Sequence, residues 1–512
     1  MNWTDHLIVA PVLVPMLAGA LMVLLDESQR RVRFFIAVFS AIVQVAIALF
    51  LVGLADGRRD EWIDSVGVYI AANWPVPFGI ALAVDRLSAV LLLLAAVLSL
   101  SALVFARARW ERAGVHFYPL FQFLMMGVNG SFLTGDLFNL YVCFEVMLIA
   151  SFVLMVHQGS PLQLEAGLKY VTINVLSSMI LLAGIGMLYG KLGTLNMVDI
   201  ARILQSTDES VLVNTTVVLL VIAFGIKSAI FPLFFWLPAS YHTLPVPVVA
   251  LFAGLLTKVG IYSYLRSFTL LFGHSTDVFG TILLWLGAAT MVTGVLGAAS
   301  QYHVRRILSF HIVSQIGYIL FAMALFSEYA IAAAVFYTIH HIIVKSNLFL
   351  VSGLISNHFG SGDLKQMGGL YRKAPLLALL FSIPALSLGG IPPLSGFWAK
   401  LSVIKAALDK DVVWIAIVAA LVGVLTLYSM TKIWVEAFWK APVDSGDAPG
   451  EMQLIGCDAV KGRKLVWWPS LLLAVLTVMI GIFPQVLFDY AELTARQLLD
   501  TSFYINAVLG SP

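Results

Sequence analysis

Apolar stretches of about 20 residues recur along the whole chain, which is the length that an α-helix needs to cross a bilayer. Of the 512 residues, 60% are hydrophobic and 11% are charged, whereas about a quarter of the residues in an ordinary soluble domain are charged. The pattern therefore predicts an all-α polytopic membrane protein with about fourteen transmembrane helices. The sequence lacks the short alternating segments of a membrane β-barrel, so we expect no strands.

The charge balance and the cysteines exclude several classes of function. The chain has 30 Lys and Arg and 28 Asp and Glu, and a net charge near zero gives no affinity for nucleic acid. Its two cysteines, Cys143 and Cys457, supply neither a disulfide framework nor metal-ligand spacing. No nucleotide-binding or phosphate-binding glycine motif occurs. We therefore expect no cofactor, no metal and no ATP-driven transport.

The basic residues predict the orientation in the membrane. Most of the Lys and Arg residues fall in alternate loops, among them Arg30, Arg305 and Lys365, and the positive-inside rule makes these loops cytoplasmic. With an even number of spans, both termini lie on the outer side. The apolar run after His6 is preceded by no basic segment, so we expect a retained first helix rather than a signal peptide. The adjacent pair Asp85 and Arg86 is expected to be an interfacial anchor.

A weak internal repeat connects the two halves of the chain. At an offset of 166 residues, the segment 172–174 (TIN) aligns with 338–340 (TIH), and at an offset of 165, Gly225 aligns with Gly390. Five spans separate the two copies, so they would have opposite orientations, as in the inverted repeats of secondary transporters. Chance similarity between apolar helices is the alternative.

Helix-breaking residues occur in both copies at matching positions. Gly225 and Pro232 lie in the seventh expected span, and the segment 389–393 (GGIPP) lies in the twelfth. Proline removes a backbone donor and clashes with the preceding turn, and exposed backbone groups in a membrane are tolerated only beside protein or a water-filled cavity. Two interrupted helices therefore indicate an ion site, although simple kinks remain the alternative.

The repeat and the polar connector divide the chain into four parts. Residues 1–115 would form the first three helices, 116–270 the first five-helix repeat and 271–440 the second. Residues 441–512 would form a Gly-, Pro- and Asp-rich cytoplasmic connector, the last helix and a tail.

Charged residues inside the apolar spans are the main functional candidates, because each costs about 3 kcal/mol at the bilayer centre. Glu145 and Lys227 both lie within such spans, and burying the two charges as one ion pair is the cheapest arrangement. A shift of the carboxylate would then switch the lysine between holding and releasing a proton. A static structural pair is the alternative.

Further candidates follow the interrupted regions. Lys258 and Lys400 come after the two breaks, and His340 and His341 precede Lys345. Neutral imidazole relays protons near neutral pH, so the tandem histidines beside a lysine indicate a proton relay, which His311 extends. Lys400 snorkelling to the outer surface is an alternative, as is a purely structural hydrogen-bonding role of the histidines. Neighbouring groups that can attract water are Thr172, Asn174, Ser177, Ser178, His242, Thr257 and Ser314.

Three segments resemble a known family. The segments 234–242 (FFWLPASYH), 249–261 (VALFAGLLTKVGI) and 390–400 (GIPPLSGFWAK) are similar to the antiporter-like subunits shared by respiratory complex I and the Mrp-type cation/proton antiporters. The segments 241–248 (YHTLPVPV) and 144–148 (FEVML) most resemble the D-type subunits of Mrp Na+/H+ antiporters. The resemblance covers nearly the whole chain.

The resemblance implies roles for individual residues. Glu145 matches the family's fifth-helix glutamate, Lys227 its seventh-helix lysine, Lys258 its eighth-helix lysine and Lys400 a twelfth-helix position that is glutamate in some relatives. His340 and His341 match the polar region of the eleventh helix.

The resemblance also implies a function and partners. It implies a subunit of a hetero-oligomeric Na+ (or K+)/H+ antiporter in the bacterial inner membrane, with protons moving along a hydrated row of these residues. A proton-pumping subunit of an NADH:quinone oxidoreductase and a structural scaffold subunit remain alternatives, because only the partner proteins distinguish the first two.

Overall fold

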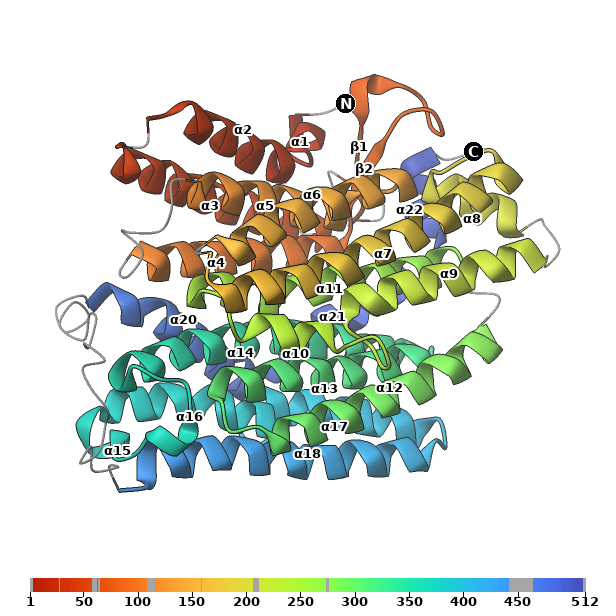
Figure 1. Ribbon diagram of the computed structural model, residues 1–512. Helices are drawn as coiled ribbons and strands as arrows, with labels where there is room; N and C mark the ends of the chain where they lie inside the picture. Colours follow the sequence, from red (N-terminus) through yellow and green to blue (C-terminus); the bar gives the residue numbers. More distant parts are fainter. Residues whose placement is uncertain are drawn as a thin grey trace.

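The protein is described here by a computed structural model, shown in Figure 1. The structure describes residues 3–26, 28–57, 62, 65–107, 116–157, 159–205, 211–272, 276–441 and 464–509. Cys457 and residues 442–463 of the expected connector lie outside the described residues.

Long helices dominate the fold and lie side by side along a common direction (Figure 1). In chain order the elements are α1 (Trp3–His6), α2 (Ala10–Leu24), α3 (Arg30–Ala55), β1 (Gly67–Ile70), β2 (Ala81–Val84), α4 (Arg86–Arg107), α5 (Phe117–Leu133), α6 (Leu137–Val156), α7 (Pro161–Leu192), α8 (Met197–Gln205), α9 (Val211–Ser228), α10 (Trp236–Tyr241), α11 (Val246–Leu270), α12 (Thr276–Ser300), α13 (Val304–Ala324), α14 (Glu328–Phe359), α15 (Leu370–Lys373), α16 (Pro375–Gly389), α17 (Ser395–Asp409), α18 (Val413–Trp434), α20 (Trp467–Ile482), α21 (Pro484–Leu499) and α22 (Ser502–Leu509).

Many of these helices are long and apolar enough to cross a membrane. Within the described residues, ten helices meet this condition, and there are up to eleven spans if α20 and α21, which meet at a bend of 82°, count as one. Helices α2 and α16 are shorter apolar segments. The prediction of a mainly helical, multi-pass membrane fold is therefore confirmed at this level.

The core of the bundle is formed by α11, α13 and α14, whose apolar segments are almost completely buried by other helices. By contrast, α3 and α7 expose much of their surface, as expected of helices that face lipid. Because the middle of α14 is enclosed by other helices, the charged groups in that part of the helix meet only protein or internal water.

The expectation that the chain contains no strands is wrong at one place. Strands β1 and β2 form an antiparallel hairpin in which Gly67 pairs with Val84 and Ile70 with Ala81. Leu82 also forms a β-bridge with Thr134, in the connection between α5 and α6. The strands have four residues each, which is too short for a periodic signal and too short to cross a bilayer, since a spanning strand needs about 9–11 residues.

Both predicted interruptions occur. Helix α9 ends at Ser228 and α10 begins at Trp236, while α16 ends at Gly389 and α17 begins at Ser395. Each break contains a residue with positive φ, Ala229 at 58° and Gly390 at 90°.

Side chains satisfy part of the backbone that the two breaks expose. The indole Nε1 of Trp236 donates to the carbonyl of Ile226 at 3.0 Å, and the amide of Gly396 donates to Ser387 Oγ at 3.1 Å. Such internal partners are required wherever a membrane helix is broken.

Asp85 and Arg86, the expected interfacial anchor, have separate partners. The Asp85 carboxylate accepts a hydrogen bond from the Ser88 amide at the start of α4 and forms an ion pair of 2.5 Å with Arg266 of α11. Both partners are buried. Arg86 instead donates its amide to Gln497 of α21 at 3.0 Å. Adjacent residues point in different directions, so a distant cation is better placed to meet the buried carboxylate.

We expect Arg266→Ala to lower the free energy of unfolding by about 3–5 kcal/mol, because the Asp85 carboxylate would remain buried without its counter-ion. Lys169→Ala is the control, since the Lys169–Glu165 pair joins two exposed side chains and such pairs contribute little. Equilibrium denaturation of both variants in detergent measures the difference. Equal losses would contradict the importance of the buried pair.

Helices α9 and α11 approach closely where Gly260 faces the end of α9. A Cβ atom on Gly260 would lie 2.3 Å from Ser228 Oγ and 3.0 Å from the Ser228 amide nitrogen. Glycine is therefore required for this contact, which brings Lys227 and Ser228 against α11.

Gly260→Ala should destabilise the protein by about 1–3 kcal/mol, because the added methyl group overlaps the Ser228 side chain. Gly186→Ala on α7 is the matched control: no atom lies within 4 Å of its added Cβ, so the substitution should be neutral or slightly stabilising. Thermal unfolding of the two variants provides the comparison. A Gly260→Ala protein as stable as the control would show that the contact is not tight.

Candidate functional site: a buried row of charged and histidine side chains

The candidate residues lie on five helices that cross the middle of the bundle. Glu145 is on α6, Lys227 near the end of α9, Lys258 on α11 and Lys400 on α17, and α14 carries His340, His341 and Lys345. Among these side chains Glu145 is partly exposed, and the other six are buried. The site therefore combines several ionisable groups inside a largely apolar interior.

The predicted ion pair between Glu145 and Lys227 is not formed. Lys227 Nζ donates to the carbonyl of Asn174 at 3.3 Å and to Ser178 Oγ at 3.1 Å, both on α7. It also lies 5.4 Å from the ring centre of Phe144. Oxygen Oε1 of Glu145 is buried and has no hydrogen-bond partner.

The helical geometry of α6 explains this difference. Successive residues of an α-helix point about 100° apart, and the buried side of α6 at this level is occupied by Phe144 rather than by Glu145. The phenyl ring therefore lies against the Lys227 ammonium group. Glu145 and Lys227 still interact electrostatically without contact.

The structure brings Lys258, His341 and Lys345 together between α11 and α14. His341 interacts electrostatically with both lysines. Lys258 Nζ donates to the carbonyl of Ala253 at 2.7 Å, and Lys345 Nζ donates to the carbonyl of Leu308 at 3.3 Å. Backbone carbonyls, rather than carboxylates, therefore hold these two ammonium groups.

The far end of the row lies at the break between α16 and α17. Lys400 Nζ donates to the carbonyl of Gly389, the last residue of α16, at 3.1 Å. His340 Nδ1 lies 2.8 Å from Ser395 Oγ at the start of α17. Lys400 is buried, so the alternative in which it snorkels to the surface is wrong. A helix end has free carbonyls, and one of these holds the ammonium group.

His311 on α13 joins this part of the row. Lys345 and Lys400 are its charged neighbours. Both ring nitrogens of His311 are buried without a hydrogen-bond partner, and the same is true of His341.

Aromatic residues beside Lys400 were not identified from the sequence. The ring centre of Tyr318 lies 5.5 Å from Lys400 Nζ. The Tyr318 ring also stacks on the Tyr337 ring, and the two ring centres are 5.3 Å apart. The Tyr337 hydroxyl donates to Gln315 Oε1 at 2.6 Å. Hydroxyl and amide groups in the otherwise apolar α13 and α14 are the sequence signal that could have revealed them.

Two hydroxyl groups lie beside the lysines of α9 and α11. Ser228 follows Lys227, and Thr257 precedes Lys258. Both hydroxyls are buried without a hydrogen-bond partner. Leaving such a group unpaired costs about 1–3 kcal/mol, so each is a place where internal water would be favourable. Thr257 was predicted as a water-attracting group, whereas Ser228 was missed.

His242 lies outside this row, although the sequence grouped it with the water-attracting residues. Its ring centre is 6.1 Å from that of His303, in the loop before α13. Burial and the neighbouring Arg306 lower the pKa of His242 to about 4, and burial and Arg305 lower the pKa of His303 to about 4. Both imidazoles are therefore neutral at neutral pH.

No three His, Cys, Asp or Glu side chains within the described part of the chain lie close enough to hold a metal ion. The row instead consists of lysines, histidines and one carboxylate held by carbonyl and hydroxyl oxygens. Lysine, histidine and glutamate side chains are groups that can bind and release protons.

Comparisons with known proteins agree with this interpretation. The chain is similar to the D-type subunit of the Na+/H+ antiporter of Alkalihalophilus pseudofirmus, with 41% identity over 99% of both chains. It is also similar to the D-type subunit of a probable K+/H+ antiporter of Rhizobium meliloti, with 34% identity over 86% of this chain and 88% of the relative. Among solved structures, a chain of the Mrp complex from Dietzia sp. superposes with a TM-score of 0.89 and 35% identity, covering all of both chains.

The family assignment rests on a sequence model as well as on these relatives. Residues 134–426, which contain every candidate residue of the row, match the model described as "NADH:quinone oxidoreductase/Mrp antiporter, TM". The chain therefore belongs to the NADH:quinone oxidoreductase/Mrp antiporter family of transmembrane proteins.

Proposed function

We propose that the chain is the proton-translocating subunit of a multisubunit Na+ (or K+)/H+ antiporter in a bacterial inner membrane. The observation that carries this proposal is the buried row from Glu145 to Lys400. The relatives named as Na+/H+ and K+/H+ antiporter subunits support it and give the cation class.

The energetics of the row argue against a scaffold subunit. Each charge at the bilayer centre costs about 3 kcal/mol even on a lenient scale, and a scaffold would gain more from apolar side chains of similar size. Lys227, Lys258, Lys345 and Lys400 donate to neutral oxygens, so each ammonium group can lose its proton without leaving a bound carboxylate unpaired.

We propose that protons pass from one lysine to the next through these groups and internal water. Movement of the Glu145 carboxylate toward Lys227 would stabilise the protonated lysine, and movement away would favour release. The Ser228 and Thr257 hydroxyls would hold water between Lys227 and Lys258. His341 and Lys345 would continue the route to His340 and Lys400.

We further propose fourteen transmembrane segments. They are the ten long helices together with α2, α5, the interrupted pair α16–α17 and the bent pair α20–α21. Both termini would then lie on the outer side, as the basic loops indicate.

Inverted repeats would comprise α5–α11 and α12–α18, with α2–α4 before them and α20–α22 after them. The paired caps of α7 and α14 support this division. Both helices have 32 residues and precede an interrupted helix. Each begins after a serine whose side chain accepts a hydrogen bond from the backbone of the first turn, Ser160 for α7 and Ser327 for α14. Each ends at a glycine in the left-handed backbone conformation, Gly193 and Gly360. Each pair of caps is 167 residues apart, close to the offset found in the sequence.

The alternative function is a proton-pumping membrane subunit of a redox complex, because the family includes NADH:quinone oxidoreductases. The partners distinguish the two. Purification of the complex should yield only further hydrophobic membrane subunits if it is an antiporter, whereas iron–sulfur and flavin subunits would establish the alternative.

Lys227→Ala and Glu145→Ala should each abolish cation-dependent proton antiport in everted vesicles while the complex still assembles, because each removes a proton-carrying charge. Lys410→Ala, at the exposed end of α17, is the control and should retain full activity. The composition of the purified variant complexes establishes assembly. Full antiport in both row variants would contradict the proposed function.

The double variant Ser228→Ala/Thr257→Val should lower the antiport rate roughly tenfold, which corresponds to about 1.4 kcal/mol on the barrier, because it removes two hydroxyls that would hold water. Ser263→Ala/Thr269→Val is the matched control on α11, since these hydroxyls donate to carbonyls of their own helix. Initial rates in vesicles with equal amounts of complex give the comparison. Equal rates would exclude a water bridge at this position.

A further inference from the structure

Helices α12 and α18 lie side by side at one edge of the bundle, opposite the N-terminal helices (Figure 1). On α12, Trp285, Val292 and Leu296 are exposed. They are seven and four residues apart, so they lie on one face of the helix.

Helix α18 has a matching exposed stripe. Trp414, Leu421, Val424 and Tyr428 are exposed large side chains at intervals of three, four or seven residues, which also places them on one face. Lys432 lies four residues after Tyr428 and continues the same stripe. An apolar face therefore ends at a cation.

The two ends of this face differ in chemistry. At one end the indole rings of Trp285 and Trp414 stack at 4.5 Å with an interplanar angle of 22°. Tryptophan is enriched where a membrane protein meets the bilayer interface. Between Trp414 and Lys432 the helix rises about 27 Å, close to the hydrocarbon thickness of about 30 Å.

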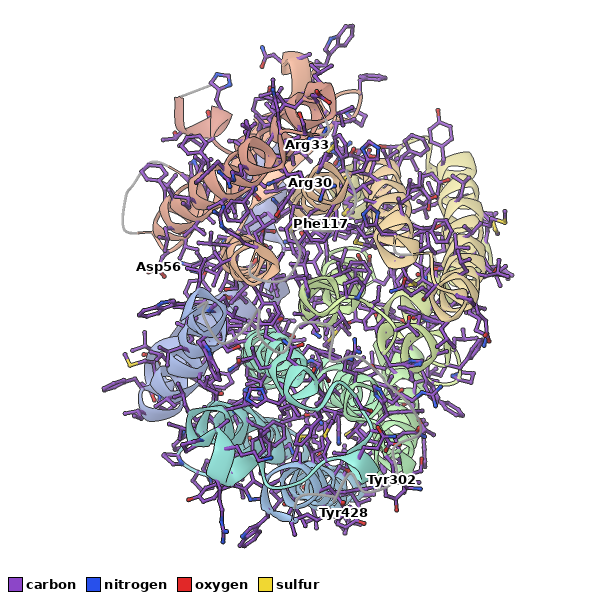
Figure 2. The ribbon with its side chains drawn as sticks, turned by 60° about the vertical axis from the view of Figure 1, so that its left-hand side comes forward. Arg30, Arg33, Asp56, Phe117, Tyr302 and Tyr428 are labelled. Atoms are coloured by element: carbon purple, nitrogen blue, oxygen red, sulfur yellow. The ribbon has the colours of Figure 1, made fainter. Side chains whose placement is uncertain are left out.

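At the other end, two lysines surround one exposed tyrosine. Lys432 Nζ lies 3.7 Å and Lys365 Nζ 4.9 Å from the ring centre of Tyr302. Lys432 also donates to the carbonyls of Ala299 and Gln301 at 3.1 and 2.8 Å, which fix its position at the end of α12. Figure 2 shows Tyr302 and Tyr428 together at the same edge of the molecule.

The positive charge of this cluster is not neutralised by contact with the described carboxylates. Glu436, one turn after Lys432, forms its ion pair with Lys440, and Asp363 accepts the backbone amide of Lys365. Neither Lys365 nor Lys432 has an ion-pair partner among the described residues. Because the two ammonium groups lie 3.7 and 4.9 Å from the same ring centre, an anion bound beside Tyr302 would be close to both positive charges.

We propose that this face binds an anionic phospholipid, with the headgroup phosphate at Lys365 and Lys432 and the acyl chains along α12 and α18. The charge of the cluster complements a phosphate, and basic clusters at the ends of membrane helices bind anionic headgroups. The exposed apolar stripes complement acyl chains. The proposal does not depend on the antiport function.

The test uses the complete purified complex, exchanged into vesicles of phosphatidylcholine with a minor fraction of phosphatidylglycerol. Mass spectrometry then measures the phosphatidylglycerol retained per complex after mild solubilisation. Lys365→Gln/Lys432→Gln should lower the retention about tenfold. Lys169→Gln/Lys191→Gln, at exposed positions of α7, is the control with the same charge change. Millimolar inorganic phosphate should not displace the lipid, because it lacks acyl chains.

Two further variants keep the test informative if Lys432→Gln perturbs the loop after α12. Lys365→Gln removes an exposed side chain and should by itself reduce retention, whereas Lys432→Arg should preserve it. Unchanged retention in the double variant, or displacement by inorganic phosphate alone, would overturn the proposal. Efficient cross-linking of Val424→Cys to another protein of the complex would also overturn it, because this face would then be a protein interface.

Discussion

The cost of placing a charge in an apolar interior is the constraint on which the rest of this structure depends. Lysines on α9, α11, α14 and α17 are buried, yet carboxylates do not hold their ammonium groups. Backbone carbonyls and a serine hydroxyl do so. Neutral partners stabilise a charge less than an ion pair would, and this weaker hold suits groups that exchange protons.

The interrupted helices and the buried core supply these neutral partners. The break between α16 and α17 frees the Gly389 carbonyl for Lys400 and places Ser395 beside His340. The break after α9 ends the helix one residue after Lys227, where Gly260 lets α11 approach. The enclosure of the middle of α14 by other helices keeps His340 and His341 away from lipid and bulk water. The exposed apolar faces of α12 and α18 lie apart from these buried groups.

Sequence reasoning identified the apolar spans, both interruptions and the candidate residues, because each depends on local composition. It did not predict the β1–β2 hairpin, whose strands are too short for a periodic signal. It paired Glu145 with Lys227, although the Lys227 ammonium group donates to oxygens of α7, and it did not identify Arg266 as the partner of Asp85. The choice of a charge partner depends on which helices are neighbours and on which faces they present.

The sequence by itself determined that this protein belongs in a bilayer, because so few of its residues are charged. It also located the row from Glu145 to Lys400, because these are ionisable residues within apolar segments. Only the tertiary structure decided how these groups are held and which of them meet. A one-residue step turns a helix by about 100°, so Phe144 rather than Glu145 faces Lys227. Such a rotation is invisible in composition and spacing, because it is set by the packing of each helix against all its neighbours.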